Sequence, residues 1–180
     1  MDSDEVLLRK ASQGCRDSLR RIYEAHKDSL LTLANALTGN RVVAEDIVHD
    51  VFVAFAKNVS RLHLATSLRS YLCVSVCNRV RDLARTEIRH RRREDQVSRP
   101  PADAQAPNVS VAAAEMEGRL RMALEQVPLD QREVLLLRTQ AGLSFEEIGQ
   151  HQGISSNTAR GRYRYGIDKL RSLLNSELEP

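Results

Sequence analysis

The residues best suited to bind another molecule lie near the C-terminus. Between Ser156 and Arg171 the sequence has four arginines and one lysine against one acid. Arginine can donate two hydrogen bonds to a guanine edge, and asparagine and threonine can bond to bases or phosphates. Wound into a helix, these polar residues share the arc left free by the apolar ones: Asn157, Thr158, Arg160, Gly161, Arg162, Arg164 and Tyr165. The pattern favours a nucleic-acid surface over a merely solvated helix face, and Gly161 would let the helix approach a groove closely.

The other side of this helix is apolar and predicts how it docks. An arc of about 120° holds the stripe expected of a packed helix. Tyr163 therefore belongs to the core, whereas Tyr165 points outward. The stripe comprises Ala159, Tyr163, Gly166, Ile167, Leu170, Leu173 and Leu174.

The residues before this helix predict a helix-turn-helix. Ser144 and Glu147 have the Ser-x-x-Glu spacing of a capping box, which begins a helix. Gly153 then separates that helix from the basic one, and Gly142 separates it from a helix for which Asp130 is the expected N-cap and Glu133 its capping-box partner. The second helix of a helix-turn-helix enters the major groove of DNA.

A second basic run covers residues 79–93, with seven arginines against two acids. It ends a predicted helix, 67–90, whose inward side holds Leu72, Cys73, Val76, Cys77, Val80, Leu83 and Ala84. The opposite face holds Tyr71, Asn78, Arg81, Asp82 and Arg85. A basic face with an exposed aromatic ring suits single-stranded nucleic acid, because phosphates meet arginines and a base stacks on the ring.

Two clusters could be mistaken for metal sites. Cys73 and Cys77 are four residues apart, but no further ligand has suitable spacing, so both are expected to be small buried side chains. The predicted helix 42–58 has a buried apolar side that includes Val43, and it presents Glu45, Asp46, His49 and Asp50 on its outer face. Without a second ligand cluster, a protein-docking face or plain solvation is the better interpretation. No metal and no cofactor is expected.

Composition limits the remaining possibilities. The chain has 28% charged and 4% aromatic residues, and most apolar positions recur at helical spacing, so an all-α fold is predicted. No P-loop, Gly-x-Ser-x-Gly or His-Glu-x-x-His motif occurs, so no enzyme is predicted and there are no catalytic residues to name. The longest apolar run, 51–56, is far below the roughly 20 residues of a membrane span. With an acidic N-terminus and an odd number of cysteines, this favours a cytoplasmic protein.

Two helical blocks flank a segment rich in proline and small polar residues. The segment 94–110 has three prolines and no apolar period, which predicts a flexible linker. At about 3.3 Å per residue it could reach roughly 56 Å, more than the roughly 34 Å of one DNA turn. The first block, 1–93, is predicted to contain four helices: Asp4–Gln13, Cys15–Leu37, Val42–Asn58 and Ser67–His90. The second block is 111–180.

Taken together, these motifs resemble the sigma-70 family of bacterial RNA polymerase sigma factors, specifically the small extracytoplasmic-function (ECF) group. AEDIVHDVF, residues 44–52, resembles that family's polymerase-docking helix. SLRSYL, residues 67–72, through NRVRD, residues 78–82, resembles its promoter-melting and −10 helix. LEQVPLDQREVLLLR, residues 124–138, leading into GLSFEEI, residues 142–148, resembles its −35 reading domain.

The resemblance implies a division of labour. Residues 1–93 would be a region 2-like domain and 111–180 a region 4-like helix-turn-helix domain. Core RNA polymerase would dock on Glu45, Asp46, His49 and Asp50. The opened −10 strand would meet Arg69, Tyr71, Asn78, Arg81 and Arg85, and a flipped base would enter the loop 60–66. The −35 duplex of promoter DNA would be read by the arc 157–165 named above.

The resemblance also implies an anti-sigma factor as a partner, and two other functions stay open. A stand-alone helix-turn-helix repressor would need neither the acidic helix nor the linker. A sigma-like decoy would bind an anti-sigma protein and not DNA, but the arginines of the last helix argue against it.

Overall fold

The computed structural model describes residues 3–62, 64, 67–91 and 111–176. These residues form eight α-helices and one short 3₁₀ helix, with no strand among them, so the predicted all-α class is confirmed. The chain divides into two compact units, residues 1–34 with 42–97 and residues 35–41 with 98–180. The predicted linker, 94–110, lies outside the described residues.

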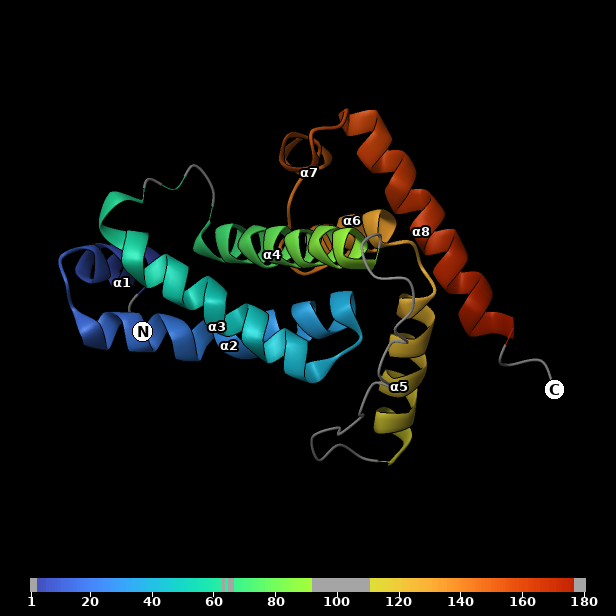
Figure 1. The fold of residues 1–180 in the computed structure, drawn as a ribbon, viewed down its shortest axis with the longest axis horizontal. Coiled ribbons are helices and arrows are strands. Elements are labelled where there is room, and N and C mark those ends of the chain that lie inside the picture. The colour runs from blue at the N-terminus through green and yellow to red at the C-terminus, as the bar shows by residue number, and fades with distance from the viewer. Residues whose placement is uncertain (1–2, 63, 65–66, 92–110, 177–180) are drawn as a thin grey trace. The chain divides into compact units, whose positions relative to one another are not determined.

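The first unit is built on four helices (Figure 1), of which only residues 35–41 at the junction of the second and third fall in the other unit, and they match the four predicted helices to within a residue or two. They are α1 (Asp4–Ser12), α2 (Arg16–Thr38), α3 (Arg41–Asn58) and α4 (Leu68–Arg91), with the 3₁₀ helix η1 (Val59–Arg61) after α3. The turn after α2 is made by Gly39, which has φ +65° and donates from its N–H to the Asn35 carbonyl at 2.8 Å. A glycine in the left-handed conformation at this point ends the helix.

The core of this unit lies where the apolar faces of α2, α3 and α4 meet. Tyr23 of α2 packs edge-on against Phe52 of α3, with ring centroids 4.8 Å apart. Burying each large aliphatic side chain stabilises the fold by roughly 1.5–3 kcal/mol. The side chains at most 2% exposed include Ile22, Leu30, Leu33, Ile47, Phe55, Leu72, Cys73, Val76 and Cys77.

Two apolar residues lie nearer the surface than the sequence pattern predicted. Leu83 was expected on the buried side of α4 but is 37% exposed. Val43 was expected inside α3 but is only half-buried. Both line an open pocket formed by residues of α3 and α4, which accounts for their exposure.

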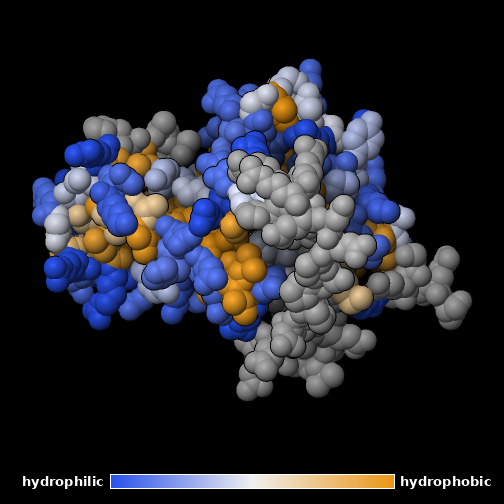
Figure 2. Space-filling model, viewed as in Figure 1, coloured by the Kyte–Doolittle hydropathy of each residue, from blue (hydrophilic) through white to orange (hydrophobic). Residues whose placement is uncertain are grey.

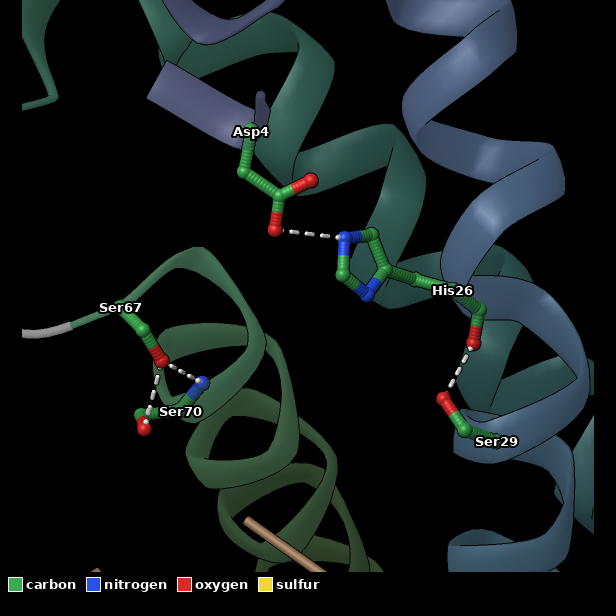
Figure 3. Close-up of polar contacts among 5 residues, drawn as sticks. All are labelled: Asp4, His26, Ser29, Ser67 and Ser70. Carbon is green, nitrogen blue, oxygen red and sulfur yellow. Dashed lines mark hydrogen bonds and ion pairs between the residues drawn. The ribbon is translucent and has the colours of Figure 1, made fainter. Parts of the chain in front are cut away.

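Polar contacts fix the ends of the helices in the first unit (Figure 3). Asp4 Oδ2 of α1 lies 3.2 Å from Nε2 of His26, a residue of α2 that is only 8% exposed. Ser67 Oγ accepts from the Ser70 backbone N–H at 3.1 Å, which is the N-cap bond that begins α4. Of the loop predicted at 60–66, residues 60 and 61 belong to η1, and residues 63, 65 and 66 lie outside the described residues.

The second unit contains α5 (Val111–Glu125), α6 (Leu129–Thr139), α7 (Phe145–Gln152) and α8 (Ser156–Ser176). Helix α8 packs against the other three. The capping box at α7 is confirmed, because Ser144 Oγ accepts from the Glu147 N–H and the Glu147 carboxylate accepts from the Ser144 N–H.

The predicted start of α6 is wrong by two residues. Its N-cap is Pro128, whose carbonyl accepts from Gln131 and Arg132, and no side chain caps it. Proline has the fixed φ that suits a helix start, so the helix begins before Asp130. Asp130 lies within the first turn, where its charge favours the helix N-terminus; its Oδ1 accepts from the Gln131 N–H, and its Oδ2 pairs with Arg162 of α8.

Two glycines shape the turn between α7 and α8. Gly153 has φ +67° and ends α7 in the left-handed conformation. A Cβ on Gly149 would lie 2.8 Å from the Ile154 carbonyl oxygen, so only glycine lets the turn pack this closely on α7. The turn therefore sets the angle at which α8 leaves α7, as a helix-turn-helix requires.

Candidate nucleic-acid interface

The polar arc predicted on α8 is largely open to solvent. Asn157, Thr158, Arg160, Arg164 and Tyr165 are exposed, whereas Gly161 and Arg162 are half-buried. A Cβ on Gly161 would meet no atom within 4 Å, which leaves the backbone there accessible. The helix thus presents a basic surface that begins at its N-terminal turn.

The N-terminus of α8 is capped by Ser155. Its Oγ accepts from the Thr158 backbone N–H at 3.0 Å and lies 2.9 Å from the Thr158 hydroxyl. The hydroxyl of Thr158 therefore takes part in the cap, although the residue is exposed. Asn157, the residue before it, is also exposed.

Arg160 is held over an aromatic ring that the sequence interpretation did not single out. Its guanidinium lies 5.4 Å from the centroid of Phe145, and the guanidinium of Arg138 lies 5.1 Å from the same ring. Phe145 also packs edge-on against Tyr163, with centroids 5.5 Å apart. A cation over a ring is attracted by about 0.5–1 kcal/mol at exposed sites. Phe145, the first residue of α7, therefore orients Arg160, whose Nη2 is also 4.0 Å from Glu146.

Unlike Asn157 and Tyr165, Arg162 is half-buried, and its side chain bonds to residues of α6 and α7. Its Nη1 donates to Gln152 Oε1 at 2.9 Å, and its Nε lies 3.1 Å from Asp130 Oδ2. Gln152 Nε2 in turn donates to Glu133 Oε2 at 2.9 Å, and Glu133 is only 1% exposed. The sequence showed these four residues but gave no sign that they meet.

The two tyrosines of α8 lie on the sides predicted for them. Tyr163 is half-buried against Phe145, and Tyr165 is 59% exposed. The Arg164 guanidinium lies 5.1 Å from the Tyr165 ring centroid. Arg164 and Tyr165 thus form an exposed cation and ring near the middle of the face.

The predicted polar face of α4 is divided between exposed and half-buried residues. Arg69, Asn78 and Arg85 are exposed, whereas Tyr71 and Arg81 are half-buried. The Tyr71 ring lies 6.3 Å from that of Phe55, so one side of it packs on the first unit's core. The structure brings these five side chains onto one helix, but Tyr71 is less open for stacking than the sequence suggested.

The cysteine pair of α4 is buried, as expected. Cys73 and Cys77 are 2% and 0% exposed. Burial raises the pKa of the Cys73 thiol to about 11, because a thiolate is poorly solvated there, and Arg69 offsets part of that rise. Within the described part of the chain, no group of three or more His, Cys, Asp or Glu residues is arranged to hold a metal ion.

The acidic face of α3 is exposed at all four predicted positions: Glu45, Asp46, His49 and Asp50. Asp50 is paired, since Nη2 and Nε of Arg79 donate to its Oδ2 at 2.7 and 3.1 Å. The open pocket beside them has a volume of about 400 Å³ and is lined by Val43, Asp46, Ile47, His49, Asp50, Arg79 and Leu83.

Apolar surface accompanies these charges. Val42 and Leu83 are 67% and 37% exposed, and Figure 2 shows orange patches among blue on this unit. A mixed acidic and apolar surface suits a protein partner better than a nucleic acid. No helix among the described residues has the length and apolar character needed to cross a membrane.

Two family models match separate parts of this chain. Residues 22–94 match sigma-70 region 2, and residues 117–170 match sigma-70, region 4. The RNA polymerase sigma factor CarQ of Myxococcus xanthus is 30% identical over 96% of this chain and 97% of its own length. The ECF RNA polymerase sigma factor EcfG of Rhodopseudomonas palustris is 31% identical over 88% of this chain and 86% of its own.

A solved structure has the same fold. The sigma factor RpoE of Bartonella quintana, determined in complex with the anti-sigma factor NepR, superposes with a TM-score of 0.69 at 21% identity, over 87% of this chain and 96% of that one. The chain belongs to the sigma-70 family of RNA polymerase sigma factors, in its ECF group.

Proposed function

We propose that this chain binds core RNA polymerase and directs it to promoters by reading their −35 and −10 elements. The observation that carries the proposal is the exposed polar arc of α8, which lies on the second helix of a capped helix-turn-helix within the region 4 match. Membership of the ECF group supports the same function for the whole chain.

Helix α8 reads the −35 duplex through its exposed residues. Arg160, oriented by Phe145, and Arg164 are placed for guanine edges or phosphates. Asn157 and Tyr165 add polar contacts at the two ends of this stretch, Thr158 lies beside the helix cap, and Gly161 lets the backbone approach the groove.

Helix α3 docks the polymerase. Glu45 and Asp46 supply exposed negative charge, and Val42 and Leu83 supply apolar contact. His49 and the Asp50–Arg79 pair border the pocket between them. A basic and apolar surface on the polymerase is the complement of this face.

Helix α4 engages the opened −10 strand. Arg69, Asn78 and Arg85 are exposed for phosphates and base edges. Tyr71 and Arg81, which are half-buried, bound this surface on the core side. Strand opening draws on the binding energy of the assembled complex, so the chain performs no covalent chemistry.

The chain acts in the cytoplasm, where polymerase and DNA are found, and an anti-sigma factor restrains it. The restraint is supported by the related Bartonella sigma factor, which was solved with its anti-sigma factor bound.

Run-off transcription tests the proposal. The purified chain is added to core polymerase with a library of promoter fragments. We expect initiation at a defined subset of fragments only when both are present. Tight duplex binding by the chain alone, independent of polymerase, would indicate a repressor, and polymerase binding without initiation on any fragment would indicate a decoy.

A further inference from the structure

Arg162 occupies the middle of the basic stretch of α8 but lies on a different side from its neighbours. A helix has about 3.6 residues per turn, so residues two apart point about 200° away from each other. Arg160 and Arg164 are four apart and share a side, whereas Arg162 points nearly opposite to both. Its burial agrees, since the side chain of Arg162 is 29% exposed and that of Arg160 is 62% exposed.

The partners of Arg162 come from α6 and α7, two of the three helices against which α8 packs. Asp130 Oδ2 of α6 lies 3.1 Å from its Nε, and Gln152 Oε1 at the end of α7 accepts from its Nη1 at 2.9 Å. Gln152 also donates to Glu133 of α6 at 2.9 Å, and Glu133 is buried. Asp130 and Glu133 are three residues apart on α6 and so present their carboxylates on one face.

These bonds tie one side of α8 to α6 and α7. The charge of Arg162 is balanced by Asp130, and two nitrogens of the planar guanidinium are bonded. Two such bonds restrict the orientation of the guanidinium more than one bond would. A small rotation of α8 would break these bonds and would turn Arg160 and Arg164 away from a docked duplex.

We propose that Arg162 is a positioning residue for −35 recognition, which holds α8 in register on α6 and α7 and does not contact DNA. This role rests on the proposed function of α8. It removes Arg162 from the set of DNA contacts that the sequence predicted, and it makes Gln152 and Asp130 determinants of promoter choice, although neither reads a base.

The test uses full-length chain reconstituted with core RNA polymerase. The probes are a labelled duplex carrying the upstream sequence that the parent holoenzyme enriches from a randomised pool, and a scrambled duplex. Affinities for both are measured across a salt series for Arg162→Met, Arg162→Lys and Gln152→Leu, with Arg160→Ala as the reference contact variant. Asp130→Asn changes an exposed side chain. It is added in case the changes at the half-buried Arg162 and Gln152 impair folding.

We expect Arg162→Met and Gln152→Leu each to lower the ratio of affinities for the selected and the scrambled duplex by at least about threefold. A variant with both changes should be little worse than either alone, because the two residues act through one contact. The salt slope should stay at the parent value, whereas loss of one phosphate contact flattens it by about 0.9. Lysine should not rescue the preference, because it keeps the charge but cannot hold both partners in the same plane.

Two results would overturn the role of Arg162. One is a flattened salt slope in Arg162→Met with lysine rescue and a silent Gln152→Leu, which would make it a DNA contact. The other is an unchanged preference in every folded variant, Asp130→Asn included, which would make it a scaffold residue only. If Arg160→Ala is also silent, the proposed −35 function of α8 fails instead.

Discussion

At the scale of single residues, aromatic rings restrict the orientation of three arginines in the second unit. Phe145 lies beneath both Arg138 and Arg160, and Tyr165 lies beneath Arg164. A guanidinium that rests on a ring has fewer orientations to lose on binding, so less entropy opposes the contact. Under the proposed function, Phe145 serves by orienting Arg160, and the sequence gave no sign of this because the contact depends on how α7 packs against α8.

Arg160→Ala should weaken binding of the holoenzyme to its −35 duplex by about tenfold, near the lower limit for a good bidentate contact to a base. Polymerase binding should be unchanged. Arg171→Ala removes the same charge from an exposed position of α8 beyond the predicted face and is the matched control. Electrophoretic mobility shifts with both holoenzymes measure the effect, and equal losses in the two variants would mean that only overall charge matters.

The three cysteines should react very differently. Hydrogen bonds from Ser18 lower the pKa of the exposed Cys15 thiol, whereas burial raises that of Cys73 to about 11. At pH 8 a thiol reagent should therefore modify Cys15 rapidly and leave Cys73 and Cys77 unmodified until the chain is unfolded. Mass spectrometry of timed samples counts the modified thiols. Fast modification of Cys73 in the native chain would contradict its burial.

The same shift has a consequence for stability at high pH. The folded pKa of Cys73 exceeds its ordinary value of 9.0, so folding favours the protonated thiol. Its contribution is fully present below pH 9 and is lost as the pH rises from there towards about 11. Urea unfolding of the parent and Cys73→Ala between pH 8 and 11 should show the steeper decline in the parent. Parallel declines would contradict the shift.

At the scale of elements, the angle between α7 and α8 depends on close packing at Gly149. Gly149→Ala would drive a Cβ against the Ile154 carbonyl, and backbone cannot move aside as a side-chain end can. We expect a loss of about 1–3 kcal/mol in the free energy of unfolding, with weakened −35 binding. Denaturant unfolding monitored by circular dichroism provides the measurement.

Gly161→Ala is the matched control for that prediction. No atom lies within 4 Å of the new Cβ, and alanine favours a helix interior over glycine by roughly 0.5–1 kcal/mol. Stability should rise, while −35 binding should fall if the backbone approaches DNA there. A stabilised variant with unchanged binding would show that Gly161 is not needed for the groove.

The capping box of α7 adds a dependence on pH. Hydrogen bonds with Ser144 lower the pKa of Glu147 below its ordinary value of 4.5, and the bond donated by the Ser144 backbone N–H has the largest effect. The contribution is therefore present above pH 4.5 and is lost as the pH falls through the lowered value. Glu147→Ala removes the titrating carboxylate, so it should lower stability at pH 7 and lower it less at pH 3. Thermal unfolding at both values measures this, and an equal cost at the two would contradict the box.

The elements themselves were largely readable from the sequence, because caps, glycine turns and helical periodicity are local signals. The four helices of the first unit, the capping box at Ser144 and the turn at Gly153 needed no tertiary information. The start of α6 was misplaced because Asp130 looks like a cap, whereas Pro128 already fixes the turn. The contacts of Arg162 and the exposure of Leu83 could not be predicted, since both depend on which helices pack together.

At the scale of the whole molecule, positive and negative charges lie on different surfaces, although they nearly balance in the whole chain. The net charge is only +3, yet α8 carries a basic arc and α3 an acidic and apolar one. Under the proposed function, the acidic face of α3 serves a protein partner, the arc of α8 serves duplex DNA, and α4 serves the opened −10 strand. Polymerase docking and −35 recognition would then rest on two separable surfaces, and damage to one surface should spare the function of the other.

Separation of the two functions is the most direct test of this account. Core polymerase is reconstituted with the parent chain, with Glu45→Lys/Asp46→Lys, or with Arg160→Ala/Arg164→Ala. Binding to the polymerase and run-off transcription from a selected promoter are then measured on the same samples. The α3 variant should lose polymerase binding and hence transcription, whereas the α8 variant should bind polymerase like the parent and lose promoter-specific initiation. Loss of polymerase binding in the α8 variant, or normal transcription in the α3 variant, would contradict the account.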